Sequence, residues 1–173
     1  MSEAADTPVH VVRPEEGESF WQPVPANGWA EVRVSYRRDP RVTSLSTGIQ
    51  VIAPNGFIRE HVHPTQDELL FFYEGTGEAW IDGVPHALVP GTTVFVGAGH
   101  RHKFVNTGEG PLAMMWVMVP GGENGLDEFF ARIGRPRSPG EPAPAPFPRP
   151  ADVLEIEAAT VFAHPAVTAG GDP

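Results

Sequence analysis

Residues His61–Gly75 read HVHPTQDELLFFYEG and carry the most informative pattern of the chain. It begins with two histidines separated by one residue, and in an extended chain such alternate side chains project from one face. Two imidazoles on one face can bind the same metal ion, because neutral imidazole is the commonest metal ligand. A single pair of this kind is more often two surface histidines. A second pair, His100 and His102, has the same spacing later in the chain, and the two pairs together predict a metal site.

Glu68 opens the apolar segment Glu68–Tyr73 and shares a face with Leu70 and Phe72. A carboxylate beside apolar side chains is costly to bury unless it is paired or bound to a metal. The position of Glu68 therefore argues for a functional role.

Glycine and proline divide the rest of the chain into short segments with strand character. Glu78–Ile81 and Val84–Val89 flank Asp82-Gly83, which favours a hairpin with a type I′ turn. Many short strands with such turns predict an all-β sandwich or barrel. The other expected strands are an edge strand at Val9–Val12 and residues 29–36, 47–53, 92–96, 100–106 and 112–119.

The character of the chain changes after Pro120. Apolar residues at helical spacing predict a helix over 126–133, which Gly134 can end. Residues 135–150 are rich in proline and are typical of an extended linker. A weakly helical segment follows over 150–163, on which we expect Glu155 and Glu157 to be solvated, and we expect the last ten residues to be disordered.

Composition excludes several classes of function. The chain has 173 residues, which fits one domain, and a net charge of −10, which disfavours nucleic acid as a partner. It has no cysteine, so disulfides, iron–sulfur clusters and thiolate sites are excluded. No apolar run reaches the ~20 residues that cross a bilayer, and the N-terminus MSEAADTPVH has no signal-peptide pattern. We expect a cytoplasmic protein without a membrane partner.

Two groups of residues resemble the motifs of the cupin superfamily. The first is Gly56, His61, His63, Glu68 and Gly75, and the second is Gly91, Gly99, His102 and Asn106. The spacing from Gly56 to His61 is one residue shorter than usual in the family, and Gly97 stands where proline is usual. The resemblance implies a double-stranded β-helix, or jelly-roll barrel, in which His61, His63, Glu68 and His102 bind one divalent ion of Fe, Mn, Ni, Co or Zn. Gln66 and Asp67 are the alternatives to Glu68 as the fourth ligand.

The resemblance also suggests how the chain is organised. We expect N-terminal strands over 1–44 that exchange in a homodimer, the cupin barrel over 45–120, and a C-terminal helix, proline-rich segment and tail over 121–173. His100 is interpreted as a turn residue, or alternatively as a catalytic base or fifth ligand. The substrate pocket is expected to be apolar, and its candidate residues are Gln66, Phe72, Trp80, Phe95, Phe104, Met114, Trp116 and Met118.

Three functions are compatible with this site. Gly125–Gly134 resembles the end of small quercetin-dioxygenase-like cupins, which favours an O₂-dependent dioxygenase with Glu68 as ligand and base. The alternatives are a non-redox cyclase, isomerase or lyase, such as a zinc-dependent polyketide cyclase, and a small-molecule-binding protein without activity. Arg59, Arg101 and Lys103 flank the histidines, but Arg101 and Lys103 are out of phase with His102. We therefore expect a neutral substrate that carries a carbonyl or enol group.

Overall fold

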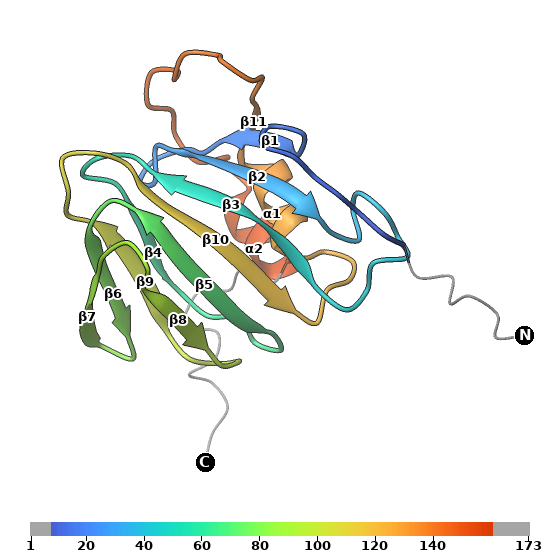
Figure 1. The fold of residues 1–173 in the computed structure, drawn as a ribbon, viewed down its shortest axis with the longest axis horizontal. Helices are drawn as coiled ribbons and strands as arrows, with labels where there is room; N and C mark the ends of the chain where they lie inside the picture. The colour runs from blue at the N-terminus through green and yellow to red at the C-terminus, as the bar shows by residue number, and fades with distance from the viewer. Residues whose placement is uncertain (1–7, 161–173) are drawn as a thin grey trace, which may run out of the picture.

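The computed structural model describes residues 8–160, which form two antiparallel sheets and two helices (Figure 1). The larger sheet has the spatial order β11 (Arg135–Pro136), β1 (Glu18–Trp21), β2 (Trp29–Val34), β3 (Ser46–Ile52), β10 (Leu112–Val119), β5 (Asp67–Glu74) and β8 (Thr93–Val96). The smaller sheet has the order β4 (Phe57–His61), β9 (His102–Asn106), β6 (Gly77–Ile81) and β7 (Val84–Leu88). The all-β prediction is confirmed.

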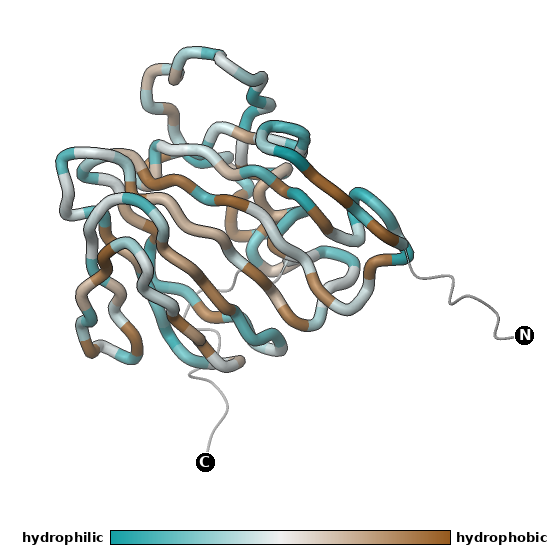
Figure 2. The backbone as a smooth tube through the Cα atoms, in the orientation of Figure 1, coloured by the Kyte–Doolittle hydropathy of each residue, from teal (hydrophilic) through white to brown (hydrophobic). Residues whose placement is uncertain are grey.

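One hydrophobic core lies between the two sheets. Side chains along each strand alternate between inward and outward positions, so that Leu70 and Phe72 of β5 are buried while Leu69 and Phe71 are partly exposed. Phe104 of β9 reaches the same core from the smaller sheet, with its ring centroid 5.6 Å from that of Phe72. Hydrophobic residues recur along the strands of both sheets (Figure 2). This alternation places the polar ends of β5 and β9 at one edge of a shared apolar interior.

Most of the expected strands are present within one or two residues of their predicted ends. The hairpin at Asp82-Gly83 has φ values of 48° and 85°, as a type I′ turn requires. The prediction of an edge strand at Val9–Val12 is wrong, because this segment pairs with no strand among the described residues and Val9 is 91% exposed. An apolar run forms a strand only where a neighbouring strand offers hydrogen bonds. The homodimer stays a prediction.

Two helices lie against one face of the larger sheet, and the proline-rich segment loops out beyond its β1–β11 edge (Figure 1). Helix α1 (Leu126–Ile133) buries Leu126, Phe129, Phe130 and Ile133 in the core, as its apolar spacing predicted. Helix α2 (Val153–Ala159) packs against α1 and buries Ile156. The expected tail disorder lies outside the described residues. No helix within 8–160 combines the length and the apolar character that a bilayer crossing needs.

The proline-rich segment is anchored to the fold and is not a free linker. Its first two residues form β11, which pairs with β1 at the edge of the larger sheet. Near its end, Phe147 is buried and the guanidinium carbon of Arg135 lies 4.0 Å from the centre of its ring. The backbone nitrogen of Val24 donates a hydrogen bond to the carbonyl of Phe147. These contacts fix the path of the chain from α1 to α2.

Asn106, the last residue of β9, holds three loops together. Its Nδ2 atom lies 2.9 Å from the carbonyl oxygens of Ile52 and Gly110 and 3.1 Å from that of Ala53, and its Oδ1 accepts from the Gly108 nitrogen. The side chain is buried, so its loss leaves buried backbone groups without partners. We expect Asn106→Ala to lower the free energy of unfolding by about 2–4 kcal/mol in urea titration. A loss below about 0.5 kcal/mol would show that these loops hold without it.

Candidate metal centre

Four side chains from three strands and a loop converge at one edge of the core. His61 ends β4, His63 follows it, Glu68 lies in β5 and His102 begins β9. One ligand atom from each of the four lies within 4.8 Å of all the others, and all four residues are buried. The imidazole centroids of His61 and His102 are 4.1 Å apart. The four residues that the cupin resemblance implied are therefore brought together.

A bulge in β4 allows His61 to face the centre. From Ile58 to His61 this strand advances three positions, while β9 advances two from Phe104 to His102. Residues three apart on a regular strand point to opposite faces, and one extra residue restores a common face. Ile58 and His61 both reach the interior as a result. The bulge also turns Arg59 toward the cavity beside the centre.

Backbone carbonyls fix the orientation of two of the imidazoles. The Nδ1 atom of His61 lies 2.8 Å from the carbonyl oxygen of Arg59, and Nδ1 of His102 lies 2.9 Å from the carbonyl oxygen of His100. A carbonyl only accepts, so each Nδ1 carries the proton of the neutral ring. The Nε2 lone pair of each ring is then directed toward the other members of the cluster. This is the tautomer that a metal ligand needs.

The donor set fits a divalent transition metal. Nε2 of His102 lies 3.1 Å from Oε2 of Glu68, and both atoms are buried. Within residues 8–160 neither atom has a hydrogen-bond partner of good geometry. A bound cation would satisfy both buried atoms. Three imidazole nitrogens and one carboxylate suit Fe, Mn, Co, Ni or Zn and leave an octahedral ion two open positions.

The electrostatics of the cluster favour the protonation states that bind metals. Burial raises the pKa of Glu68, but its contacts with His102 and His63 outweigh burial and hold the pKa well below its usual range. Burial, reinforced by His102 and His63, lowers the pKa of His61 well below its ordinary value. A carboxylate and a neutral imidazole are therefore present near neutral pH. Neither has to lose a proton before an ion binds.

The alternative residues lie outside the cluster. His100 lies in a turn before β9, where Gly99 has a φ of 82°, and its Nδ1 is 2.6 Å from Oδ2 of exposed Asp82. His100 does not share a face with His102, because the extended chain begins only at His102. Gln66 is buried but donates to the Pro120 carbonyl, and Asp67 accepts from the Ala98 nitrogen.

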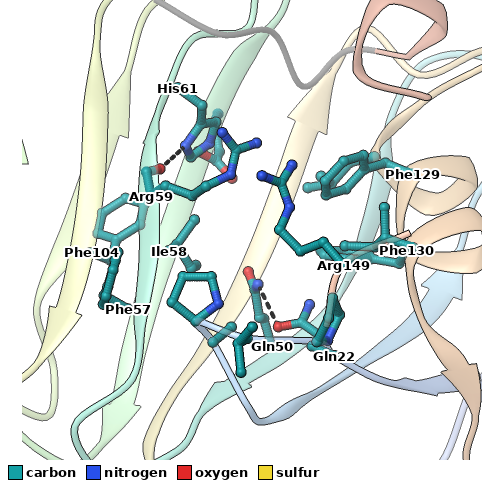
Figure 3. Close-up of a pocket in the computed structure, with 17 residues that line it drawn as sticks. Gln22, Gln50, Phe57, Ile58, Arg59, His61, Phe104, Phe129, Phe130 and Arg149 are labelled. Atoms are coloured by element: carbon teal, nitrogen blue, oxygen red, sulfur yellow. Dashed lines mark hydrogen bonds between the residues drawn. The ribbon is translucent and has the colours of Figure 1, made fainter. Parts of the chain in front are cut away.

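A cavity opens beside the cluster, and Figure 3 shows the residues around it. His61 and Glu68 form one wall, and apolar side chains from β4, β9, α1 and residues 23–26 form most of the rest. Four polar side chains complete the lining, namely Gln22, Gln50, Arg59 and Arg149. The amide Nε2 of Gln50 donates to Oε1 of Gln22 at 3.2 Å. The cavity therefore combines an aromatic wall with a small number of directed polar groups.

The predicted pocket residues divide into three groups. Phe104 lines the cavity, whereas Phe72, Met114, Trp116 and Met118 are fully buried core residues. Trp80 is on the outer face of β6, because its neighbour Ala79 faces the core. The ammonium group of Lys103 lies over the Trp80 ring. Phe95 is 65% exposed on β8. Of the predicted residues, Phe104 therefore lines this cavity, whereas Trp80 and Phe95 lie outside it, since the inward phase of a strand cannot be known from aromatic content alone.

Sequence reasoning missed the helical wall and the second arginine. Phe129 and Phe130 were recognised as the apolar face of α1, but the sequence does not say that this face closes a cavity. Arg149 lies in the proline-rich segment, which was interpreted as a linker. Glu157 was expected to be solvated, but its side chain is only 4% exposed and binds Arg59 and Arg149. Glu157 directly follows Ile156, whose apolar side chain is buried on α2, and this neighbour was the signal in the sequence that Glu157 could be buried too.

The architecture and the four converging side chains define the class of protein. Two facing antiparallel sheets with a cluster of three histidines and a glutamate between them form a double-stranded β-helix with a candidate metal centre. Residues 48–118 match the family model of the cupin domain. The chain therefore contains a cupin domain, and the predicted family is confirmed.

Several similar proteins come from species of Streptomyces. The chain is 33% identical over 78 residues to protein SchB of Streptomyces halstedii, which covers 45% of this chain and 56% of SchB. It is 27% identical over 116 residues to the tetracenomycin polyketide synthase protein TcmJ of Streptomyces glaucescens, covering 61% of this chain and 78% of TcmJ. Among solved structures, the polyketide cyclase RemF of Streptomyces resistomycificus matches 64% of this chain and 79% of RemF, with a TM-score of 0.56 and 16% identity. The match to SchB thus spans little more than half of that protein.

Proposed function

We propose that this chain is a metal-dependent enzyme that rearranges or cyclises an aromatic, polyketide-like carbonyl compound without net oxidation. The observation that carries the proposal is the opening of the His61, Glu68 cluster into a cavity with aromatic walls. The similarity to TcmJ, whose name places it with a polyketide synthase, supports the substrate class. The fold shared with the cyclase RemF supports a reaction of the same kind.

The four clustered residues would hold the ion, which when bound supplies a Lewis acid for a carbonyl or enolate oxygen. Glu68 stays ionised because of its lowered pKa, so its charge offsets part of the charge of the ion. The Nδ1 contacts of His61 and His102 with backbone carbonyls keep both rings oriented. The apolar wall excludes water from a reactive substrate, and the amides of Gln22 and Gln50 offer hydrogen bonds to its oxygens.

The dioxygenase expected from the sequence is the second candidate. The same donor set with open positions is compatible with a non-haem iron oxygenase, which binds O₂ beside the substrate. The names of TcmJ and RemF refer to polyketides and, for RemF, to cyclisation. For this reason we place the redox-neutral reaction before the dioxygenase. The non-enzymatic binding protein remains the third candidate.

Turnover under nitrogen and in air separates the candidates. We expect the zinc-loaded protein to convert aryl poly-β-ketones under nitrogen as fast as in air, with loss of water and no consumption of O₂. Mass spectrometry of the products and an oxygen electrode measure both quantities, and protein treated with a chelator is the control. Turnover that requires O₂ with an iron-loaded protein would establish the dioxygenase instead. Binding without turnover, with every metal, would contradict both reactions.

A further inference from the structure

Two glutamine side chains form a polar pair at the end of the cavity away from the metal centre. Gln22 directly follows β1 and Gln50 lies on β3, and the two residues are 4% and 7% exposed. Both line the cavity, and Figure 3 shows them at the opposite end of it from His61, joined by a hydrogen bond. On the inward face of the sheet, Gln50 is flanked by Ala30 and Met114, which are both fully buried. Two amides in such a place are stable only with hydrogen-bond partners.

The pair leaves one donor group and one acceptor for a ligand. Nε2 of Gln50 donates to Oε1 of Gln22 at 3.2 Å. Within residues 8–160, Nε2 of Gln22 and Oε1 of Gln50 form no hydrogen bond, and neither atom is fully enclosed. Turning both amides over reverses the direction of the bond and again leaves one donor and one acceptor. In either orientation the cavity is therefore offered an N–H group beside a carbonyl oxygen.

The amide pair lies too far from the metal centre to contact the oxygen that an ion there would bind. Across the larger sheet, Glu68 is level with Met118, and Met118 is level with Ser46. Gln50 lies four positions beyond Ser46 on β3, which is about 13 Å along the strand, since each strand residue advances roughly 3.3 Å. A ligand whose carbonyl reaches the metal centre therefore meets the amides with its other end.

A hydroxyl group and a carbonyl oxygen side by side complement this pair of amides. The carbonyl of such a ligand accepts from the free amide N–H, and its O–H donates to the free amide oxygen. An enolised β-dicarbonyl group has this arrangement, whereas a diketone, a lactone or a carboxylate presents acceptors only. A ligand without an O–H or N–H group would leave a buried amide oxygen without a donor, and a site built in this way rejects such ligands.

We propose that Gln22 and Gln50 together bind an enolised β-dicarbonyl or hydroxy-ketone group at the end of the substrate remote from the metal centre, and so select the enol over the diketone. The proposal deepens the proposed function, since it rests on this cavity being the substrate pocket. The two glutamines are then specificity-determining residues, which bind the substrate without touching the reacting carbonyl. Neither residue was predicted from the sequence, because they are 28 positions apart and only the pairing of β1, β2 and β3 brings them together.

Two bicyclic probes that differ in one ring atom test the pair on metal-free protein. Isoquinolone is a lactam with an N–H beside its carbonyl, which stands in for the enol O–H, and isocoumarin is the lactone with a ring oxygen in that place. We expect titration calorimetry to show that isoquinolone binds about tenfold more tightly than isocoumarin, as one matched and one unmatched buried acceptor imply. Because no metal is present, failure of the metal-dependent reaction would leave this ratio intact.

Substitution of each glutamine distinguishes a binding role from a purely structural one. Gln22→Met and Gln50→Met remove one amide each with little change of shape, and each is expected to weaken isoquinolone about tenfold while isocoumarin changes less than about twofold. Gln66→Met is the matched control, because Gln66 is a buried amide that does not line the cavity, and it should keep the wild-type ratio. A structural pair predicts lower melting temperatures with the same ratio of affinities in every variant, and that result would overturn the proposal. Equal affinity of the wild-type protein for both probes, or binding of neither, would also overturn it.

Discussion

His102→Ala is expected to lower the affinity of the chain for divalent transition metals by more than about a hundredfold and to abolish turnover. Removing a group that hydrogen-bonds to a metal ligand already lowers metal affinity about 10–100-fold, and removing a ligand itself lowers it further. His102 is fully buried, and its Nε2 atom is the group nearest to Glu68 in the cluster. Its removal leaves the carboxylate without its main partner. Metal content after dialysis against each ion, measured by mass spectrometry, checks the result.

A matched variant separates the loss of a ligand from the loss of a histidine. His86 is exposed on β7 and lies outside the cluster, so His86→Ala is expected to keep full metal content. Circular dichroism of both variants confirms that the sheets are retained. An H102A protein that keeps one ion per chain with wild-type affinity would contradict the assignment of His102.

Gly75→Ala is expected to destabilise the fold by about 2–5 kcal/mol, although the residue does not line the cavity. Gly75 has a φ of 84°, where a side chain costs about 1–2 kcal/mol. A Cβ atom there would lie 2.2 Å from the carbonyl oxygen of Pro111 and 2.9 Å from Cα of Leu112, so the backbone must also move. Forcing atoms into a packed region costs a further 1–3 kcal/mol, approximately. Urea unfolding measures the sum.

Gly83 provides the control for the backbone conformation alone. Its φ of 85° is nearly the same, but a Cβ atom there would meet nothing within 4 Å in the described part of the chain. Gly83→Ala is therefore expected to cost only about 1–2 kcal/mol. Equal losses at the two positions would show that close packing against Pro111 does not explain why the first motif has glycine here.

Much of the fold was predictable because local patterns agree with the tertiary structure. The alternation in β5, the turn at Asp82-Gly83 and the apolar spacing of α1 each follow from the nearest neighbours in the chain. The convergence of His61 and His102 was predictable only through the resemblance to a family. Their sequence separation and the bulge in β4 leave no local signal that the two residues are paired.

The residues that sequence reasoning misplaced depend on long-range packing. His100 has the spacing of a ligand, but a glycine turn directs it to Asp82. Arg149 follows a run of prolines, and only the docking of Phe147 and α2 brings it to the cavity. Glu157 is buried because two arginines surround it. The sequence alone does not give the three-dimensional path of residues 135–159, so it cannot show that this segment completes the pocket.

The central claim is that His61, His63, Glu68 and His102 bind one divalent ion. Crystal diffraction recorded on either side of the absorption edge of the metal found in the purified protein tests it most directly. We expect a single strong anomalous peak within bonding distance of all three imidazoles and of the Glu68 carboxylate. A strong peak elsewhere in the chain, or metal-saturated crystals without a peak between these four side chains, would contradict the account.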